Sequence, residues 1–409
     1  MKRLLRPVIL YLLWHGVKRK VGFERPRVIA VTGSIGKTSA KDAIAKVLEA
    51  SGFPVVKTHG NLGTDIGVPL SLFGFEELAS RLGWLLVLWR AFFPPCLRYE
   101  KRPYYVLEYS SDKPGDIAFL TGKLPANVGV VTTVAPVHMQ FFADLKAWVV
   151  EELAVSHGLS AGGSLIANAD DPHQAILRQE HVETIWYGME GIEIDRSEAG
   201  LVFARGGIRY QTSLIGVHQL YPLLAAIAVG ESEGVSSENI LRQVAAYQVP
   251  AGRGRLLQGK NGLTIIDDTY NSSPKAVKAA LLMLKEIAGK RPTIAVLGQM
   301  NELGERSEEL HREVAAAALS VDRLVLVGPH GEAMRDSAVQ AGLPTDRIVV
   351  FQTSEECLER FAEIVFNDEV ILIKASQNGM RLERLVKSLL ADPADAKQLV
   401  RQSLTWKQV

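Results

Sequence analysis

The sequence predicts an α/β protein with two domains, each built on a mainly parallel sheet with helices on its faces. Three observations support this prediction. Short β-branched apolar runs alternate with helix-compatible stretches from residue 28 to residue 391, which is typical of parallel sheets. A glycine-rich turn follows the first of these runs directly. A stretch rich in Gly, Pro and Arg, residues 250–255, separates two series of strands and helices.

Length and composition set the general class of protein. The 409 residues are too many for one ordinary domain, so two or three domains are expected. Hydrophobic residues make up 47% and charged residues 22%, the balance of a globular protein. Two distant cysteines, Cys96 and Cys357, form neither a disulfide framework nor a metal-site spacing, so we expect a reducing cytoplasm.

The N-terminal arm, residues 1–26, is basic and partly apolar. Residues 1–27 hold eight Lys or Arg and one acid, so they carry +7, while the rest of the chain carries −6. The apolar run Val8–Trp14 has seven residues, and spanning a bilayer takes about 20. No small-residue cleavage site follows, which argues against a signal peptide. Two interpretations stay open: a helix packed on the body, or a helix through which residues 1–20 contact an anionic membrane.

The first strand leads into a phosphate-binding loop. Val28–Thr32 is the strand, and helix-compatible residues run from Ser39 to Ser51. Glycines between them allow backbone N–H groups to surround phosphate oxygens at the start of a helix. Lys37 would reach the terminal phosphates of ATP, and the Thr38 hydroxyl would hold Mg²⁺. The expected nucleotide-binding residues here are Gly33, Ser34, Gly36, Lys37, Thr38 and Ser39. The alternative is a chance glycine-rich turn.

Further strands and helices follow in the first domain. The apolar stretch Trp84–Trp89 is either a core helix or a second membrane-facing patch. Ligands are expected at the carboxyl ends of parallel strands, where Glu108 ends one strand and His138 follows the next. The expected strands cover residues 55–57, 105–108, 127–133 and 164–168, an antiparallel patch lies within residues 182–215, and two helices lie within residues 217–246.

The second series begins after a linker, Pro250–Arg255. Polar side chains crowd the stretch Asp267–Pro274, either as a binding site or as a helix start capped by Asn271 or Ser272. The expected strands cover residues 264–267, 293–297, 323–327, 347–350 and 370–373. The domain limits are therefore an arm at 1–26, a central ATP-binding domain at 27–249, a C-terminal Rossmann-like domain at 250–391 and a polar tail at 392–409.

Taken together, these motifs resemble the Mur ligase family, the ATP-dependent amide-forming enzymes of peptidoglycan precursor synthesis. The phosphate loop carries the resemblance, together with Asn168–Pro172, Asp267–Pro274, Leu297–Gly304 with His311, and Lys374–Ser376. The later motifs resemble the branch that adds D-alanyl-D-alanine to a precursor peptide. The resemblance implies that a substrate carboxylate takes the γ-phosphoryl group of ATP and that an amine then attacks the acyl phosphate.

The resemblance also implies roles for individual residues. Lys37 would bind the β- and γ-phosphates, Thr38 and Glu108 would hold one Mg²⁺, and Glu108 with His138 a second. Arg253, Asp268 and Asn271 would bind the nucleotide from the second domain, whose closure would complete the site. The expected partners are a cell-wall precursor peptide and a dipeptide or amino acid, with no nucleic acid; no oligomeric state is predicted.

The chain departs from the family pattern at four places. Only 32 residues precede Gly33, so the usual N-terminal domain that binds the UDP-sugar is expected to be missing. Gln219 and Pro222 replace two asparagines, one of which usually faces adenine, and Gln299 replaces an aspartate. The family's carbamylated lysine corresponds to Glu152, which we expect to act in its place through a water on the metal. The alternative is that Glu152 is a surface glutamate. Its neighbour Glu151 is expected to be such a residue, so that Glu151→Gln should be nearly silent.

Two other functions stay open. A ligase of this type could act on another acceptor, such as a polyglutamate or a cofactor. A nucleotide-binding membrane scaffold without ligase activity is an alternative from another class, but the intact Lys37, Thr38, Glu108 and His138 argue against it. We expect a cytoplasmic protein, with a peripheral position at the inner face of the membrane as an option.

Overall fold

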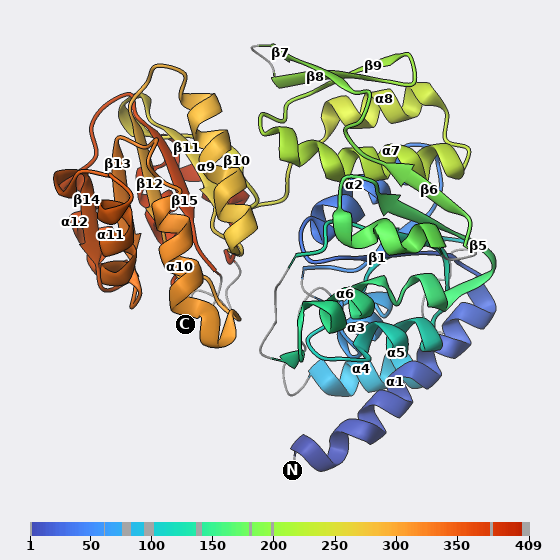
Figure 1. The fold of residues 1–409 in the computed structure, drawn as a ribbon. Coiled ribbons are helices and arrows are strands. Elements are labelled where there is room, and N and C mark those ends of the chain that lie inside the picture. The colour runs from blue at the N-terminus through green and yellow to red at the C-terminus, as the bar shows by residue number, and fades with distance from the viewer. Residues whose placement is uncertain are drawn as a thin grey trace. The chain divides into compact units, whose positions relative to one another are not determined.

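The computed structural model confirms the α/β fold class. It describes residues 2–60, 62–75, 83–93, 102–135, 141–179, 182–197, 200–376 and 379–402, with side chains from residue 6 onward. Two compact units divide the chain: Met1–Ser213 with Leu220–Tyr247, and Leu214–Gln219 with Gln248–Val409. Figure 1 shows the elements of both units. His138, which the sequence analysis expected to hold a metal, lies outside the described residues.

The first unit is organised around a six-stranded sheet in which every neighbouring pair is parallel, in the order β2-β3-β1-β4-β5-β6. β1 is central, and its residues after Arg27 are buried on both faces of the sheet and are β-branched or small. Parallel strands align their carboxyl ends at one edge, so the loops after β1, β3 and β4 meet there. The strands are β1 (Arg27–Thr32), β2 (Val55–Lys57), β3 (Tyr104–Glu108), β4 (Ala126–Val131), β5 (Leu159–Asn168) and β6 (Thr184–Tyr187).

Helices cover both faces of this sheet. α2 and α7 pack on β1, β3 and β5 from one side, and α8 packs on α2. On the other side, Val28 and Ala30 of β1 share a core with Ile117 and Trp148 of α5 and α6. The helices are α2 (Lys37–Glu49), α3 (Gly67–Leu72), α4 (Gly83–Phe92), α5 (Asp116–Lys123), α6 (Leu145–Leu153), α7 (Leu220–Ser232) and α8 (Ser237–Ala246).

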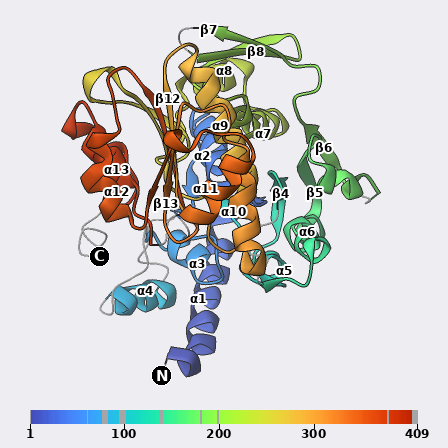
Figure 2. The same ribbon diagram turned by 60° about the vertical axis from the view of Figure 1, so that its left-hand side comes forward.

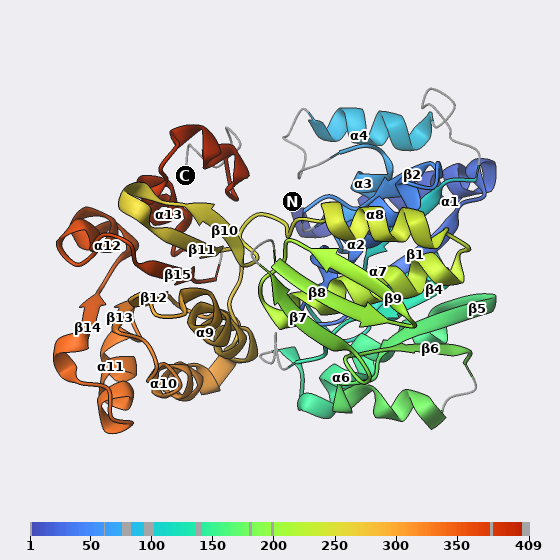
Figure 3. The same cartoon turned by 90° about the horizontal axis from the view of Figure 1, so that it is seen from above.

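The expected antiparallel patch is a three-stranded sheet packed on the outer side of α8 (Figure 3). Phe203 and Tyr210 stack with ring centroids 5.0 Å apart across neighbouring strands, so this sheet has a small aromatic core of its own. Its strands are β7 (Glu193–Ser197), β8 (Gly200–Arg205) and β9 (Ile208–Thr212).

The second unit contains a six-stranded sheet in the order β10-β11-β15-β12-β13-β14. Its first strand corrects the sequence analysis, which placed Arg255 in a linker: β10 begins at this residue and pairs antiparallel with β11. β10 was missed because it is short and directly follows Gly252 and Gly254. The strands are β10 (Arg255–Gln258), β11 (Thr264–Asp268), β12 (Thr293–Leu297), β13 (Arg323–Val327), β14 (Ile348–Phe351) and β15 (Val370–Lys374).

Two cores lie on opposite faces of this sheet. Figure 2 shows α12 and α13 on one side of the strands and α9, α10 and α11 on the other. The N-cap of α9 is Ser273, and not Asn271 or Ser272 as the sequence suggested, because Pro274 occupies the first turn and sets the cap position. The helices are α9 (Pro274–Ala288), α10 (Ser307–Ala316), α11 (Gly331–Gln340), α12 (Ser354–Arg360) and α13 (Glu383–Leu389), and a 3₁₀ helix, Pro393–Gln398, follows them.

The basic arm is part of the first unit. It forms α1 (Lys2–Glu24), which buries Leu13, Trp14 and Val17 in the main core of that unit. Lys20 and Glu24 are also buried; they form an ion pair, and Tyr105 donates its hydroxyl hydrogen bond to Glu24. None of the helices in the described ranges is both long and apolar enough to cross a membrane.

We predict that Glu24→Gln destabilises the protein by about 3 kcal/mol, because it removes the carboxylate that neutralises the buried Lys20. The free energy of unfolding in urea measures this loss. A double variant, Lys20→Met with Glu24→Gln, should recover most of the stability while keeping an acceptor for Tyr105. Equal losses in the single and the double variant would contradict the prediction.

Candidate active site

The phosphate loop connects β1 to α2 at the carboxyl edge of the first sheet. Gly33 and Gly36 have positive φ angles of 118° and 92°, a region that glycine adopts without a steric penalty. Gly33 also approaches β4 so closely that an added Cβ would lie 2.2 Å from Thr132 Oγ1. Both glycines are therefore required by the geometry of the loop.

The amides of the loop divide into two groups. Ser34 N and Ile35 N donate to Thr133 O at 2.8 and 3.0 Å, and Gly33 N donates to Glu152 Oε2 at 2.8 Å. These amides are bonded to protein acceptors. The amides of the first turn of α2, from Lys37 to Ser39, have no acceptor within the helix. An anion such as phosphate is therefore expected at the start of α2, where the helix dipole also favours it.

Thr38 and Glu108 lie together at this edge. The Thr38 hydroxyl donates to Glu108 Oε2 at 3.0 Å, and the Lys37 ammonium donates to Gly33 O. The sequence analysis missed Lys41, which is buried and places its ammonium 3.7 Å from Glu108 Oε2. Its spacing could have identified it, because residues three apart on a helix lie on one face and Lys41 follows Thr38 by three.

Glu108 is also fixed by the neighbouring loop. Its backbone N–H donates to Thr58 Oγ1 at 2.9 Å, and the Ser110 hydroxyl lies 3.4 Å from Glu108 Oε1. Ser110 N donates to Gly63 O at 2.9 Å, so the glycine-rich loop of residues 59–66 borders the site. Thr58 thus fixes the backbone of Glu108, and Ser110 contacts its carboxylate.

Glu152 is a buried residue, so the interpretation as a surface glutamate is wrong. Its side chain is 1% exposed, and Oε2 accepts from Thr32 Oγ1 at 2.6 Å as well as from Gly33 N. Oε1 is buried with no hydrogen-bond partner in the described part of the chain. A buried carboxylate oxygen without a partner is costly, which indicates that a water, a metal ion or another donor completes this site.

Glu151 is buried as well, so the expectation that its replacement is silent is corrected. Its two oxygens accept from Gly115 N and Ile117 N, each at 2.7 Å. These amides belong to the start of α5, where an anion is favoured by the helix dipole. Glu151 therefore holds α5 and does not face the solvent.

Two further residues support the loop after β4: Trp148, which the sequence analysis missed, and Asp171, which lies in the motif Asn168–Pro172. Trp148 Nε1 donates to Ala135 O at 2.9 Å and lies 3.1 Å from Ser34 Oγ, which accepts from Ala135 N at 2.9 Å. Asp171 Oδ2 accepts from Val134 N at 2.5 Å. No local pattern identifies Trp148, because its role depends on contacts with distant segments of the chain.

The donor atoms at this edge suit Mg²⁺. Thr38 offers a hydroxyl, Glu108 a carboxylate and Glu152 an unpartnered carboxylate oxygen, and Mg²⁺ prefers hard oxygen ligands. Within the described ranges, no group of three or more His, Cys, Asp or Glu residues could hold a metal by itself. Mg²⁺ commonly takes one or two protein carboxylates and completes its shell with phosphates and waters.

The second unit has a polar cluster of its own at the carboxyl ends of β11 and β15. Lys374 is buried, and its ammonium donates to Asp268 Oδ2 at 2.7 Å and to Asn271 O at 3.0 Å. The Arg253 guanidinium stacks over the Tyr270 ring at 4.0 Å from the centroid. The unit thus brings Asp268 and Asn271 together around one lysine, with Arg253 held on an aromatic ring.

Three buried oxygens in this cluster have no partner among the described residues: Ser272 Oγ, Ser273 Oγ and Asp267 Oδ2. The other Asp267 oxygen accepts from Thr269 Oγ1 at 2.6 Å. Burial raises the pKa of Asp267 to about 6, against hydrogen bonds from Thr269 that lower it. The unpartnered hydroxyls at the start of α9 can accept or donate, so they suit a polar ligand.

His311 positions the loop after β12. It is fully buried, Met300 N donates to its Nε2 at 2.8 Å, and its Nδ1–H donates to Ser307 O at 2.6 Å. Burial lowers the pKa of His311 to about 4, so the imidazole is neutral, as this bonding pattern requires. His311 therefore holds the backbone in place and is not available as a proton donor.

Gln219 has a similar structural role. Its Oε1 accepts from Gly216 N at 3.2 Å, and its Nε2 donates to Gly254 O at 3.0 Å. The amide thus connects residues 214–219 to the chain just before β10. These bonds explain why a glutamine stands where the family has asparagine: its longer side chain reaches both Gly216 and Gly254.

A parallel α/β sheet, a glycine loop before a helix, and a threonine beside a carboxylate define a nucleotide-binding protein of the phosphate-loop class. Residues 31–230 match the family model described as Mur ligase middle domain, and residues 252–377 match the one described as Mur ligase, glutamate ligase domain. The chain belongs to the Mur ligase family.

Several individual proteins are similar to this chain. The UDP-N-acetylmuramoyl-tripeptide--D-alanyl-D-alanine ligase of Bacillus subtilis (strain 168) is 30% identical over 378 residues, covering 90% of this chain and 76% of that enzyme. The MurF ligase of Thermotoga maritima, solved in complex with ADP, is 25% identical with a TM-score of 0.74, covering 93% of this chain and 82% of that one. A MurF structure from Acinetobacter baumannii, at 24% identity and a TM-score of 0.78, covers 94% of this chain and 81% of that one and shows the same fold.

We predict that Asp267 makes the protein less stable as the pH rises. Its pKa is about 6 in the folded protein against an ordinary value of 3.8, so the unfolded chain binds fewer protons between these values. The stabilisation is complete below pH 3.8 and is lost as the pH rises through about 6. Between pH 5 and pH 7.5, Asp267→Asn should gain about 1 kcal/mol of unfolding free energy relative to the wild type. Urea denaturation at each pH measures this difference. If the unfolding free energies of the wild type and Asp267→Asn change with pH in the same way, the raised pKa of Asp267 is refuted.

Proposed function

We propose that this chain is an ATP-dependent ligase that joins D-alanyl-D-alanine to the peptide of a cell-wall precursor through an acyl phosphate. The observation that carries the proposal is the contact of Thr38 with Glu108 at the start of α2, where the helix N-terminus suits a phosphate and the carboxylate suits Mg²⁺. Family membership and the relative from Bacillus subtilis support the type of substrate. The proposed ligase domains are residues 27–249 and 250–391.

The reaction proceeds in two steps. A carboxylate oxygen of the precursor bonds to the γ-phosphorus of ATP, and the bond from that phosphorus to the ADP oxygen breaks. The amine of the dipeptide then bonds to the acyl carbon and loses a proton, while the carbon–oxygen bond to phosphate breaks. The products are the amide, ADP and phosphate. The protein contributes position and charge neutralisation, as in other phosphoryl transfers.

Residues at the carboxyl edge of the first sheet have assigned roles in this proposal. The amides of Lys37 to Ser39 bind phosphate oxygens, and the Lys37 ammonium moves from Gly33 O to the transferring group. Thr38 and Glu108, with His138 from outside the described residues, would hold Mg²⁺, which supplies charge neutralisation on the phosphates. The proposed location is the cytoplasm, where ATP is supplied.

The second unit contributes the remaining proposed nucleotide ligands, Arg253, Asp268 and Asn271. Lys374 keeps Asp268 and the backbone of Asn271 in fixed positions, which reduces the ordering that binding requires. The expected contact of residues 1–20 with an anionic membrane is a separate property of α1 and does not depend on the ligase chemistry.

We propose that Glu152 takes the place of the carbamylated lysine. Its Oε2 fixes the start of the phosphate loop through Thr32 and Gly33, and its free Oε1 is available to a water on the metal. A permanent carboxylate needs no dissolved CO₂, so activity is expected to be indifferent to added bicarbonate.

For the ligase activity, we predict phosphate release from ATP only when both a precursor peptide and D-alanyl-D-alanine are present, with the joined product identified by mass spectrometry. Lys37→Ala should lower turnover on the order of 10²-fold or more, because no other described cation in the loop neutralises the transferring group. Lys46→Ala, near the other end of α2, is the matched control and should keep normal turnover. Phosphate release without an acceptor, or near-normal ligation by Lys37→Ala, would reject the proposal.

For Glu152, we predict that Glu152→Gln lowers turnover while ATP binding survives, because the phosphates are held by α2 and not by this side chain. Glu151→Gln is the matched variant on the same helix, and its expected defect is different. It should lose about 1–2 kcal/mol of stability, since one of the two α5 amides loses its acceptor, but keep turnover below its melting temperature. Thermal unfolding, nucleotide titration and steady-state rates separate the two, and equal small effects on turnover would remove Glu152 from the site.

A further inference from the structure

α4 has an unusual distribution of exposed residues. The helix is apolar almost all round, a composition typical of buried helices, yet only Val87 and Ala91 are fully buried. Large apolar side chains are exposed instead, with Leu85 at 68% and Trp89 at 47%. The exposed set on and just after α4 is Leu85, Leu86, Trp89, Phe92 and Phe93.

These side chains form one continuous face. Leu85, Trp89 and Phe92 follow the i, i+4, i+7 spacing of a helix, so they align along it, and Leu86 and Phe93 lie beside them. Val87 and Ala91 lie on the opposite side and pack into the core of the first unit. Single exposed apolar residues are common, but a contiguous apolar face marks an interaction site.

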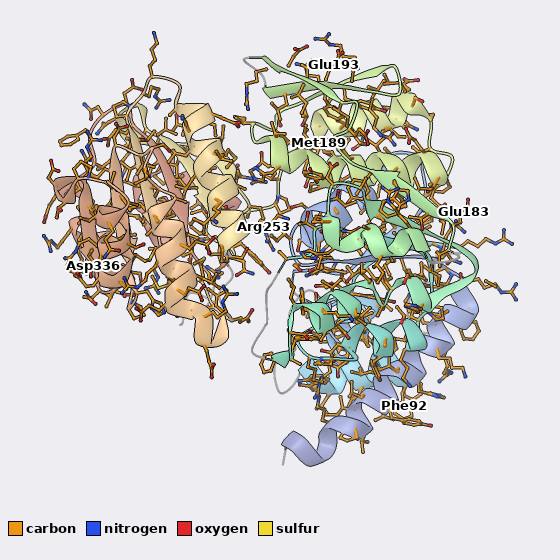
Figure 4. All side chains as sticks on the ribbon, viewed as in Figure 1. Phe92, Glu183, Met189, Glu193, Arg253 and Asp336 are labelled. Atoms are coloured by element: carbon orange, nitrogen blue, oxygen red, sulfur yellow. The ribbon has the colours of Figure 1, made fainter. Side chains whose placement is uncertain are left out.

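α1 lies beside α4 and adds positive charge to the same surface. The two helices meet at Gly16, where an added Cβ would lie 2.7 Å from Ala91 O. The Arg19 guanidinium donates to the backbone oxygen of Phe92 at 2.9 Å. Phe92 is the last residue of α4 and is labelled in Figure 4. Lys18 is exposed next to Arg19. α4 contains no acid, and the single acid of α1, Glu24, is buried.

We propose that the exposed faces of α1 and α4 together form a docking surface for an anionic lipid membrane. The apolar side chains of α4 would enter the boundary between headgroups and acyl chains, where Trp is favoured. Lys18 and Arg19 would contact lipid phosphates. Charge complementarity identifies the occupant: an apolar face beside the exposed cations of α1, with no exposed carboxylate on the described residues of α1 and α4, matches an anionic lipid surface.

The docking surface is fixed to the body of the first unit. Trp14 Nε1 donates to Asp65 O at 2.9 Å, and Arg6 pairs with Asp65 Oδ2 at 2.7 Å. Asp65 lies in the glycine-rich loop whose Gly63 O accepts from Ser110 N, beside Glu108. A membrane that binds α1 and α4 therefore orients the whole first unit, unlike a membrane bound through a flexible tether.

Flotation with vesicles tests the proposal on the full-length protein. Deleting the arm is unsuitable, because α1 contributes Leu13, Trp14 and Val17 to the core. We expect binding to vesicles of phosphatidylglycerol and phosphatidylcholine in equal parts, and little binding to phosphatidylcholine alone. Leu85→Ser with Trp89→Ser should weaken binding by about tenfold or more. Lys18→Glu with Arg19→Glu should also weaken it, and salt should weaken the wild type.

Matched controls come from the second unit. Leu282, on α9, is 66% exposed, close to the value for Leu85, and Leu282→Ser should leave vesicle binding unchanged. Lys285→Glu with Lys290→Glu, both exposed, is the control for charge reversal. Thermal unfolding and ATP turnover verify that each variant is folded. The proposal is overturned if the wild-type protein does not bind anionic vesicles. It is also overturned if the variants of α1 and α4 bind these vesicles as well as the control variants do. Concentration-dependent dimers that Leu85→Ser dissolves, without vesicle binding, would identify a second copy of the chain as the occupant.

Discussion

The start of the phosphate loop is fixed from two sides, and the position of α2 depends on this. Glu152 accepts from Gly33 N, and Thr133 O accepts from the next two amides, so the loop is bound to α6 and to the end of β4 before any ligand arrives. The loop amides that many phosphate sites use are therefore bonded within the protein. The N-terminus of α2 therefore remains as the position where a phosphate is expected.

Much of the fold follows from local patterns, because buried parallel strands are continuous β-branched runs. β12 and β13 lie at the residues the sequence indicated, and the glycine spacing located the phosphate loop. The burial of Glu151 and Glu152 could not be predicted, because Leu145–Leu153 has no clear apolar periodicity and its carboxylates are buried against amides from distant segments. β10 and the cap of α9 were misplaced for a related reason: glycine, proline and serine allow several local structures, and tertiary pairing selects one.

The basic arm shows how charge counted along a sequence differs from charge at a surface. Lys20 is neutralised by Glu24 inside the protein, and Arg6 is paired with Asp65. Arg19 stays exposed and contacts the end of α4, and Lys18 is exposed beside it in the sequence, a smaller charge than the arm's total. The position of the cations, more than their number, therefore makes this surface distinctive.

Residues 214–219 belong to the second unit although α7 and α8, which follow them, belong to the first. The chain therefore passes between the units three times, and the second unit is discontinuous in sequence. A fragment beginning at Gln248 would lose the Gln219 amide that binds Gly254 O, and it would uncover Met283, which lies against Gly216. Proteolysis at either of the first two connections would leave the units covalently joined, whereas a cut after Tyr247 would separate residues 248–409 from the hexapeptide. Separating them for individual study calls for a circularly permuted or grafted chain that carries this hexapeptide with the C-terminal half.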